Sequence, residues 1–175
     1  MNILQWLQSK IVLIAVVIIL VSSVTGFFYH QMDQFEQEEL ENRARKLSQI
    51  ITDMENTDAD EMVQRITFHE DNEGIYLPPE VGGDPYTVQI TKGYVRLKQD
   101  GRDTVEGLGA DVHLWGPGGM NESGTLGKDE MEWRDEMNPE LELEAGERDL
   151  RLIMLRLNDG ARYENHIFIT REGTD

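Results

Sequence analysis

The stretch SKIVLIAVVIILVSSVTGFFYHQ, residues 9–31, decides how this chain is built. No charged side chain occurs from Ile11 to Tyr29. As a helix, the 18 residues from Ile11 to Phe28 would span roughly 27 Å, close to the hydrocarbon thickness of a bilayer. The sequence therefore predicts a membrane-spanning helix that contacts lipid, with span residues Ile11, Ile14, Val17, Ile18, Val21 and Phe28.

Two interpretations compete for this apolar segment, a retained anchor and a cleaved signal peptide. The small residues of Val24-Thr25-Gly26 would suit a cleavage site. The apolar run is longer, however, than the usual signal-peptide core of about 7 to 15 residues, and the helical pattern continues past the site. We therefore expect the segment to be retained as an anchor.

The flanks of the segment predict its orientation. Lys10 is the only basic residue among the first 32, and basic residues favour the cytoplasmic side. Trp6 before the segment and Phe27-Phe28-Tyr29 at its end resemble the aromatic belts of a membrane span. We expect a single-pass protein of the cell membrane, with a cytoplasmic N-terminus and an extracellular C-terminal domain.

The remaining chain is uniformly acidic and lacks cysteine. The 175 residues have a net charge of −18, with 34 acidic and 16 basic residues. Such a surface repels nucleic acid and anionic headgroups, so we expect no nucleic-acid partner. Without cysteine there are no disulfides and no thiolate metal sites.

A strongly helical stretch without glycine or proline follows the apolar segment. It predicts one continuous helix from about Ile3 to Asn56. Apolar residues recur along it at spacings of 4, 3, 4 and 3, at Leu40, Ala44, Leu47, Ile51 and Met54. This apolar stripe would pack either on the chain's own downstream domain or on neighbouring subunits.

The pattern beyond this helix predicts one short helix and then strands. Acidic residues at Asp58 and Asp60 favour a second helix over residues 59–68. After Gly74, residues 86–90 and 94–99 form a predicted hairpin around Lys92-Gly93, and residues 111–115 form a further strand. A glycine-rich stretch then interrupts the pattern over residues 116–140.

The C-terminal part predicts a second hairpin. The nearly continuous apolar run of residues 150–157 is typical of a central strand, with Ile153 and Leu155 in the core, and it pairs with residues 163–170. The expected fold is α+β: a long N-terminal helix (membrane span plus amphipathic extension) followed by a mainly antiparallel β-sheet domain. The expected parts are residues 1–32 (stub and span), 33–73 (helical stalk and second helix) and 74–175 (β domain).

No catalytic motif is present. The four histidines, His30, His69, His113 and His166, are far apart in sequence, so we expect no metal site and strand or surface positions for them. Acidic residues over 100–103 are expected to form an ordinary turn. Asn121-Glu122-Ser123 is a possible glycosylation sequon. We expect no enzyme activity and no cofactor, and the sequence identifies no small-molecule substrate.

A short N-terminal stub, an apolar helix over residues 11–28, its amphipathic continuation and a distal sheet together resemble type IV pilin-like surface proteins, those of archaea in particular. The resemblance implies that the apolar part of the helix anchors the subunit and then forms a filament core with copies of itself or other pilin-like subunits. Small residues that let helices approach lie on one face, at Ala15, Ser22 and Gly26.

Two other classes remain as alternatives. A membrane-tethered sensor or ligand-binding module would use the helix as a signalling stalk, although only about ten residues would lie inside the cell. A tethered hydrolase would need a nucleophile and a base that no motif supplies.

Overall fold

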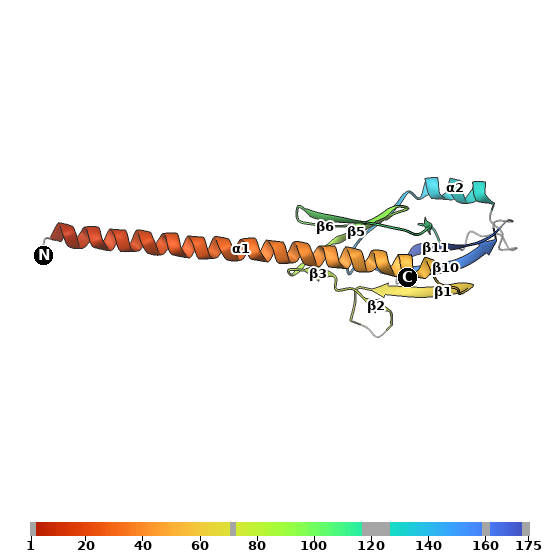
Figure 1. Ribbon diagram of the computed structural model, residues 1–175, viewed down its shortest axis with the longest axis horizontal. Helices are drawn as coiled ribbons and strands as arrows, with labels where there is room; N and C mark the ends of the chain where they lie inside the picture. Colours follow the sequence, from red (N-terminus) through yellow and green to blue (C-terminus); the bar gives the residue numbers. More distant parts are fainter. Residues whose placement is uncertain (1–2, 71–72, 117–126, 159–161, 173–175) are drawn as a thin grey trace. The chain divides into compact units, whose positions relative to one another are not determined.

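Helix α1 (Ile3–Glu55) opens the computed structural model, which describes residues 3–70, 73–116, 127–158 and 162–172. The predicted continuity of this helix is confirmed, and Figure 1 shows it in red to orange. The chain divides into two units, residues 1–38 and residues 39–175, so α1 contributes to both. The α+β class is also confirmed, because a mainly antiparallel sheet domain follows the helix.

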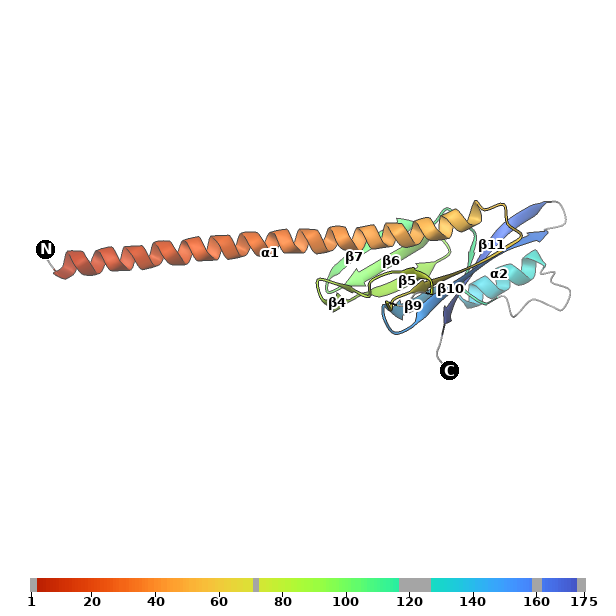
Figure 2. The same cartoon turned by 90° about the horizontal axis from the view of Figure 1, so that it is seen from below.

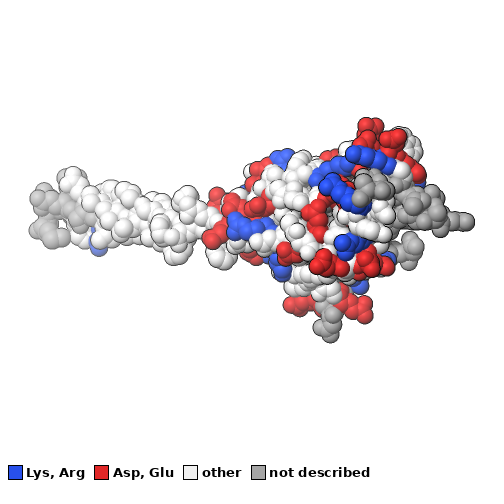
Figure 3. Space-filling model, turned by 45° about the vertical axis from the view of Figure 1, so that its right-hand side comes forward, with Lys and Arg blue, Asp and Glu red and all other residues white. Residues whose placement is uncertain are grey.

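The first unit is a helical segment whose described side chains are exposed, except for Glu36 and Gln37, which are partly buried. It contains a stretch long and apolar enough to cross a membrane, and no residue of that stretch is buried. A single membrane span and a signal sequence share this property. Figure 3 shows the segment almost free of charged side chains, whereas acidic and basic residues are spread over the sheet domain.

The second unit is organised around the last four turns of α1. All five residues of the apolar stripe are at most 1% exposed: Leu40, Ala44, Leu47, Ile51 and Met54. They form one hydrophobic cluster with residues of both β-sheets. Of the two alternatives for the stripe, packing on the chain's own domain is therefore the one observed.

The larger sheet has five strands in the order β2-β1-β10-β11-β8. Their bounds are Ile75–Tyr76 (β2), Glu61–Thr67 (β1), Asp149–Asn158 (β10), Tyr163–Glu172 (β11) and Val112–His113 (β8). The two end strands pair in parallel, and the three long strands are antiparallel. The predicted C-terminal hairpin is confirmed, and β10 lies at the centre of the sheet (Figure 1).

A four-stranded antiparallel sheet, in the order β7-β6-β5-β9, supplies the other part of the core (Figure 2). Its strands are Arg102–Gly107 (β7), Tyr94–Gln99 (β6), Thr87–Thr91 (β5) and Glu140–Glu144 (β9). The predicted β5–β6 hairpin is confirmed. Asp100 and Gly101 both have positive φ and close the β6–β7 turn, as an Asp-Gly pair favours. A short ribbon joins Glu80–Val81 (β3) to Asp84–Pro85 (β4).

Polar contacts fix α1 to both sheets. The Ser48 hydroxyl donates to the carbonyl of Gly107 at the end of β7, over 2.8 Å. On the other sheet, the Asn165 amide of β11 donates to the carbonyl of Glu55 over 2.6 Å. These bonds satisfy polar groups at the margins of the apolar contact.

Tyr86 and Arg43 form a second polar contact beside the core. The buried Tyr86 hydroxyl and the Arg43 guanidinium both donate to the carbonyl of Pro78, over 2.9 and 2.7 Å. Burial raises the pKa of Tyr86 to about 12, although the nearby Arg43 opposes this shift.

Helix α2 (Lys128–Met137) packs on the other face of the five-stranded sheet. Its Met131 joins Trp115 and Phe168 in a separate cluster, and the side chains of Ile153, Leu155 and Leu157 pack against it. Alternation along the strands explains the two clusters, because successive side chains point to opposite faces.

Three sequence expectations were wrong. Residues 61–67 form strand β1 instead of a second helix, because pairing with β10 along six residues outweighs the weak helical signal. Ile153 and Leu155 are only partly buried, because their neighbours Leu152 and Met154 face the main core. The glycine-rich stretch also contains α2, within its described part.

We predict that Leu152→Ala destabilises the domain much more than Ile153→Ala. Leu152 is fully buried, so its truncation to alanine should lower the free energy of unfolding by about 2–5 kcal/mol. Ile153 is partly buried, so its truncation should lower it by at most about 2 kcal/mol. Chemical denaturation of the full chain in detergent measures both. Equal losses would contradict the assignment of the two faces.

We also predict that Tyr86 makes stability fall at alkaline pH. The folded pKa lies above the ordinary value of 10, so the unfolded chain loses this proton first and stability declines as pH rises from 10 towards 12. Between about pH 9 and pH 11, the difference in unfolding free energy between the parent and Tyr86→Phe should shrink by about 1 kcal/mol. A difference independent of pH would contradict the burial of this hydroxyl.

Candidate functional site

Strand register brings together three side chains that the sequence separates. Strand β8 runs parallel to β11, with Val112 opposite Ile167 and His113 opposite Phe168. The Ile167 amide also donates to the carbonyl of Asp111 over 3.1 Å. Alternation along both strands then places Asp111, His113 and His166 on the face that α2 covers.

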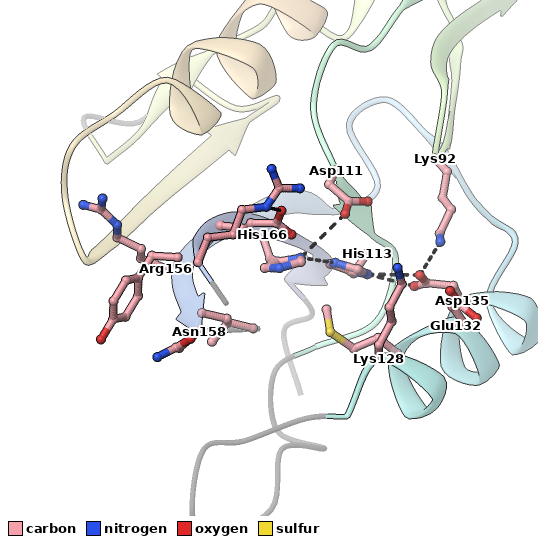
Figure 4. Close-up of a pocket in the computed structure, with 14 residues that line it drawn as sticks. Lys92, Asp111, His113, Lys128, Glu132, Asp135, Arg156, Asn158 and His166 are labelled. Carbon is pink, nitrogen blue, oxygen red and sulfur yellow. Dashed lines mark hydrogen bonds and ion pairs between the residues drawn. The ribbon is translucent and has the colours of Figure 1, made fainter. Parts of the chain in front are cut away.

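These three side chains form a cluster, with the carboxylate of Asp111 beside the two neighbouring imidazoles (Figure 4). Nε2 of His113 is 2.9 Å from Nδ1 of His166, within hydrogen-bonding distance. The same Nδ1 atom of His166 is 3.8 Å from a carboxylate oxygen of Asp111. His113 and His166 are 2% and 8% exposed, so the two imidazoles meet inside the domain.

Asp135 of α2 fixes the orientation of His113. Its carboxylate accepts a hydrogen bond from Nδ1 of His113 over 3.0 Å and one from the Trp115 indole over 2.7 Å. The ammonium group of Lys92, in the β5–β6 turn, also pairs with it. Burial alone would raise the pKa of Asp135, but the donors Lys92, His113 and Trp115 outweigh this effect and lower it. Asp135 is therefore a buried carboxylate, and it holds His113 with Nδ1 as the donor.

Aromatic rings hold the imidazole pair from the other side. The Phe168 ring stacks on His113, with centroids 5.0 Å apart. Trp115 meets Phe168 edge to face, and the Arg134 guanidinium lies 5.0 Å from the Trp115 ring. The site is thus built on two strands and one helix, with packed rings that restrict rotation of the imidazoles.

A cavity of about 420 Å³ opens beside the imidazole pair. Asp111, His113, His166 and Asp135 all line it. Basic side chains also reach it, from Lys128 on α2 and from Arg156 on β10. The pocket thus combines two imidazoles, carboxylates and positive charge.

Among the described residues, Asp111, His113 and His166 could jointly hold a metal ion. One ligating atom from each lies within 4.8 Å of the others. Sequence spacing did not reveal this group, because His113 and His166 are 53 residues apart. The sequence signal for this group is the alternation Asp-Val-His over residues 111–113 and His-Ile-Phe over residues 166–168. This alternation predicts a shared face only when the two strands are known to be neighbours.

The residues expected to span a membrane lie in the first unit and are exposed. The large ones are between 50% and 64% exposed: Ile11, Ile14, Val17, Ile18, Val21 and Phe28. Ala15, Ser22 and Gly26 are also exposed, and a side chain built at Gly26 would meet nothing within 4 Å. Their proposed contact with other helices stays a prediction. Asn121 lies outside the described residues.

Comparisons of the chain with protein families, with curated proteins and with solved structures find no match.

Proposed function

We propose that this protein is a membrane-anchored extracellular structural or assembly protein of the type IV pilin-like kind. One observation carries the proposal: a single helix is apolar and uncovered over residues 11–28 and supplies the domain core over residues 40–54. A long apolar N-terminal helix followed by a sheet domain is compatible with the pilin-like architecture.

The uncovered apolar part supports anchoring. Large apolar side chains are exposed along the helix from Ile11 to Tyr29. Exposure of so long an apolar surface to water has a high free-energy cost. A lipid environment removes this cost. The Ser23 hydroxyl donates to the Ile19 carbonyl over 2.8 Å, so it has a partner without water.

The alternative function is a membrane-tethered module that binds a ligand. The cavity beside His113 and His166 favours it, because convergent polar groups in a concave site are typical of binding sites. Anchoring is common to both functions, and assembly through the apolar helix separates them.

We predict that the mature protein keeps residues 11–28, with residue 33 onward outside the cell. Protease treatment of intact cells should remove the sheet domain, and N-terminal sequencing of the membrane fraction should find a chain that still contains Ile11. A soluble mature chain that begins near Phe27 would contradict the anchor.

We predict that assembly depends on the face formed by Ala15, Ser22 and Gly26. The chain has no cysteine, so Ala15→Cys provides a unique site for disulfide crosslinking between subunits. Added Ser22→Leu or Gly26→Leu should reduce the crosslinked fraction, because leucine prevents close approach while preserving membrane insertion.

Val17→Leu serves as the matched control off this face and should leave the crosslinked fraction unchanged. Absence of crosslinking in the Ala15→Cys parent would contradict assembly through this helix and favour the tethered binding module. Unchanged crosslinking in both Ser22→Leu and Gly26→Leu would contradict the assigned face.

A further inference from the structure

We propose that Asp111, His113 and His166 bind a divalent transition-metal ion of the zinc class, with Asp135 as the positioning residue for His113. The site is independent of the anchoring function and would exist in either functional class. Asp111 directly precedes strand β8, which contains His113, whereas His166 lies on β11 and Asp135 on helix α2.

The donor set selects the class of ion. Two imidazole nitrogens and one carboxylate oxygen suit zinc and its neighbours, whereas calcium and magnesium prefer oxygen ligands alone. The ligating atoms of Asp111, His113 and His166 already lie within 4.8 Å of one another. Three protein ligands beside a cavity leave a fourth position for water or an anionic oxygen.

The distances between the ligating atoms approach those of a tetrahedral zinc site. Nitrogen ligands about 2.0–2.1 Å from a tetrahedral zinc ion lie roughly 3.3 Å apart. The His113 Nε2 and His166 Nδ1 atoms are 2.9 Å apart, and His166 Nδ1 is 3.8 Å from the Asp111 carboxylate. These two pairs need shifts of about half an ångström to reach that spacing. The remaining pair, His113 and Asp111, lies within 4.8 Å and needs a shift of at most about 1.5 Å, which rotation of the exposed Asp111 side chain can supply. Metal binding would replace the proton that the two imidazoles share.

The hydrogen bond from His113 to Asp135 supports the metal site independently of the distances between the ligating atoms. Ligating histidines usually donate their other ring nitrogen to a carboxylate, which fixes the ring and increases its basicity. Here Nδ1 of His113 donates to Asp135, so Nε2 faces His166. Trp115 and Lys92 in turn bind the Asp135 carboxylate and fix its position, so the orientation of His113 is fixed as well.

The test uses the full chain in detergent micelles, stripped of metal with a chelator. Titration with Zn²⁺ should give one ion per chain with a micromolar or tighter Kd, and Co²⁺ should give the visible absorption of a low-coordinate nitrogen and oxygen site. Excess Ca²⁺ or Mg²⁺ should leave Zn²⁺ bound. Weaker than millimolar Zn²⁺ binding by the parent, or displacement by Ca²⁺, would overturn the proposal.

Variants identify the ligands. His166→Gln and Asp111→Asn should each weaken Zn²⁺ binding at least tenfold. The Asp111 side chain is 57% exposed, so Asp111→Asn tests the site without disturbing the core. His69→Gln, which changes an exposed histidine of the same domain, should bind Zn²⁺ like the parent.

Asp135→Asn should weaken binding about 10- to 100-fold and change the Co²⁺ spectrum, while one ion per chain still binds. Parent-like affinity in both Asp111→Asn and His166→Gln, with the circular dichroism of the folded chain, would overturn the assignment. Equal weakening in His69→Gln would show surface binding and would overturn it too.

Discussion

The fold depends on the burial of one apolar stripe of α1 between two sheets. Five side chains from Leu40 to Met54 are at most 1% exposed and join residues of both sheets in one cluster. At about 1.5–3 kcal/mol for each large buried side chain, this contact is worth on the order of 10 kcal/mol as an upper estimate. Such a value is comparable with the whole stability of a domain, so neither sheet has a complete core without the helix.

This constraint links the sheet domain to the apolar segment. The residues that complete the core belong to the same helix as the uncovered residues 11–28. Within the domain, hydrogen bonds from Ser48 and Asn165 fix the helix to both sheets. In the proposed function, the membrane anchor and the domain core are therefore parts of one helix. The pocket on the opposite face of the five-stranded sheet is separate from this helix and carries the proposed metal site.

The sequence predicted those parts of the fold that local signals determine. The α1 stripe follows helical spacing, and the β5–β6 hairpin follows an alternating pattern around Lys92-Gly93. Residues 61–67 were assigned wrongly because the strand that pairs with them, β10, begins more than 80 residues later. The His113–His166 contact was missed for the same reason, since it depends on the parallel pairing of β8 with β11.

Amide hydrogen exchange along α1, on the full chain in micelles, tests the shared role of this helix most directly. We expect residues 40–54 to exchange only through global unfolding of the sheet domain, with the same protection as β10. We expect the protection of residues 11–28 to depend on the micelle. Fast exchange over residues 40–54 while β10 stays protected would show that the sheets keep their core without the helix, and would contradict the shared role of α1.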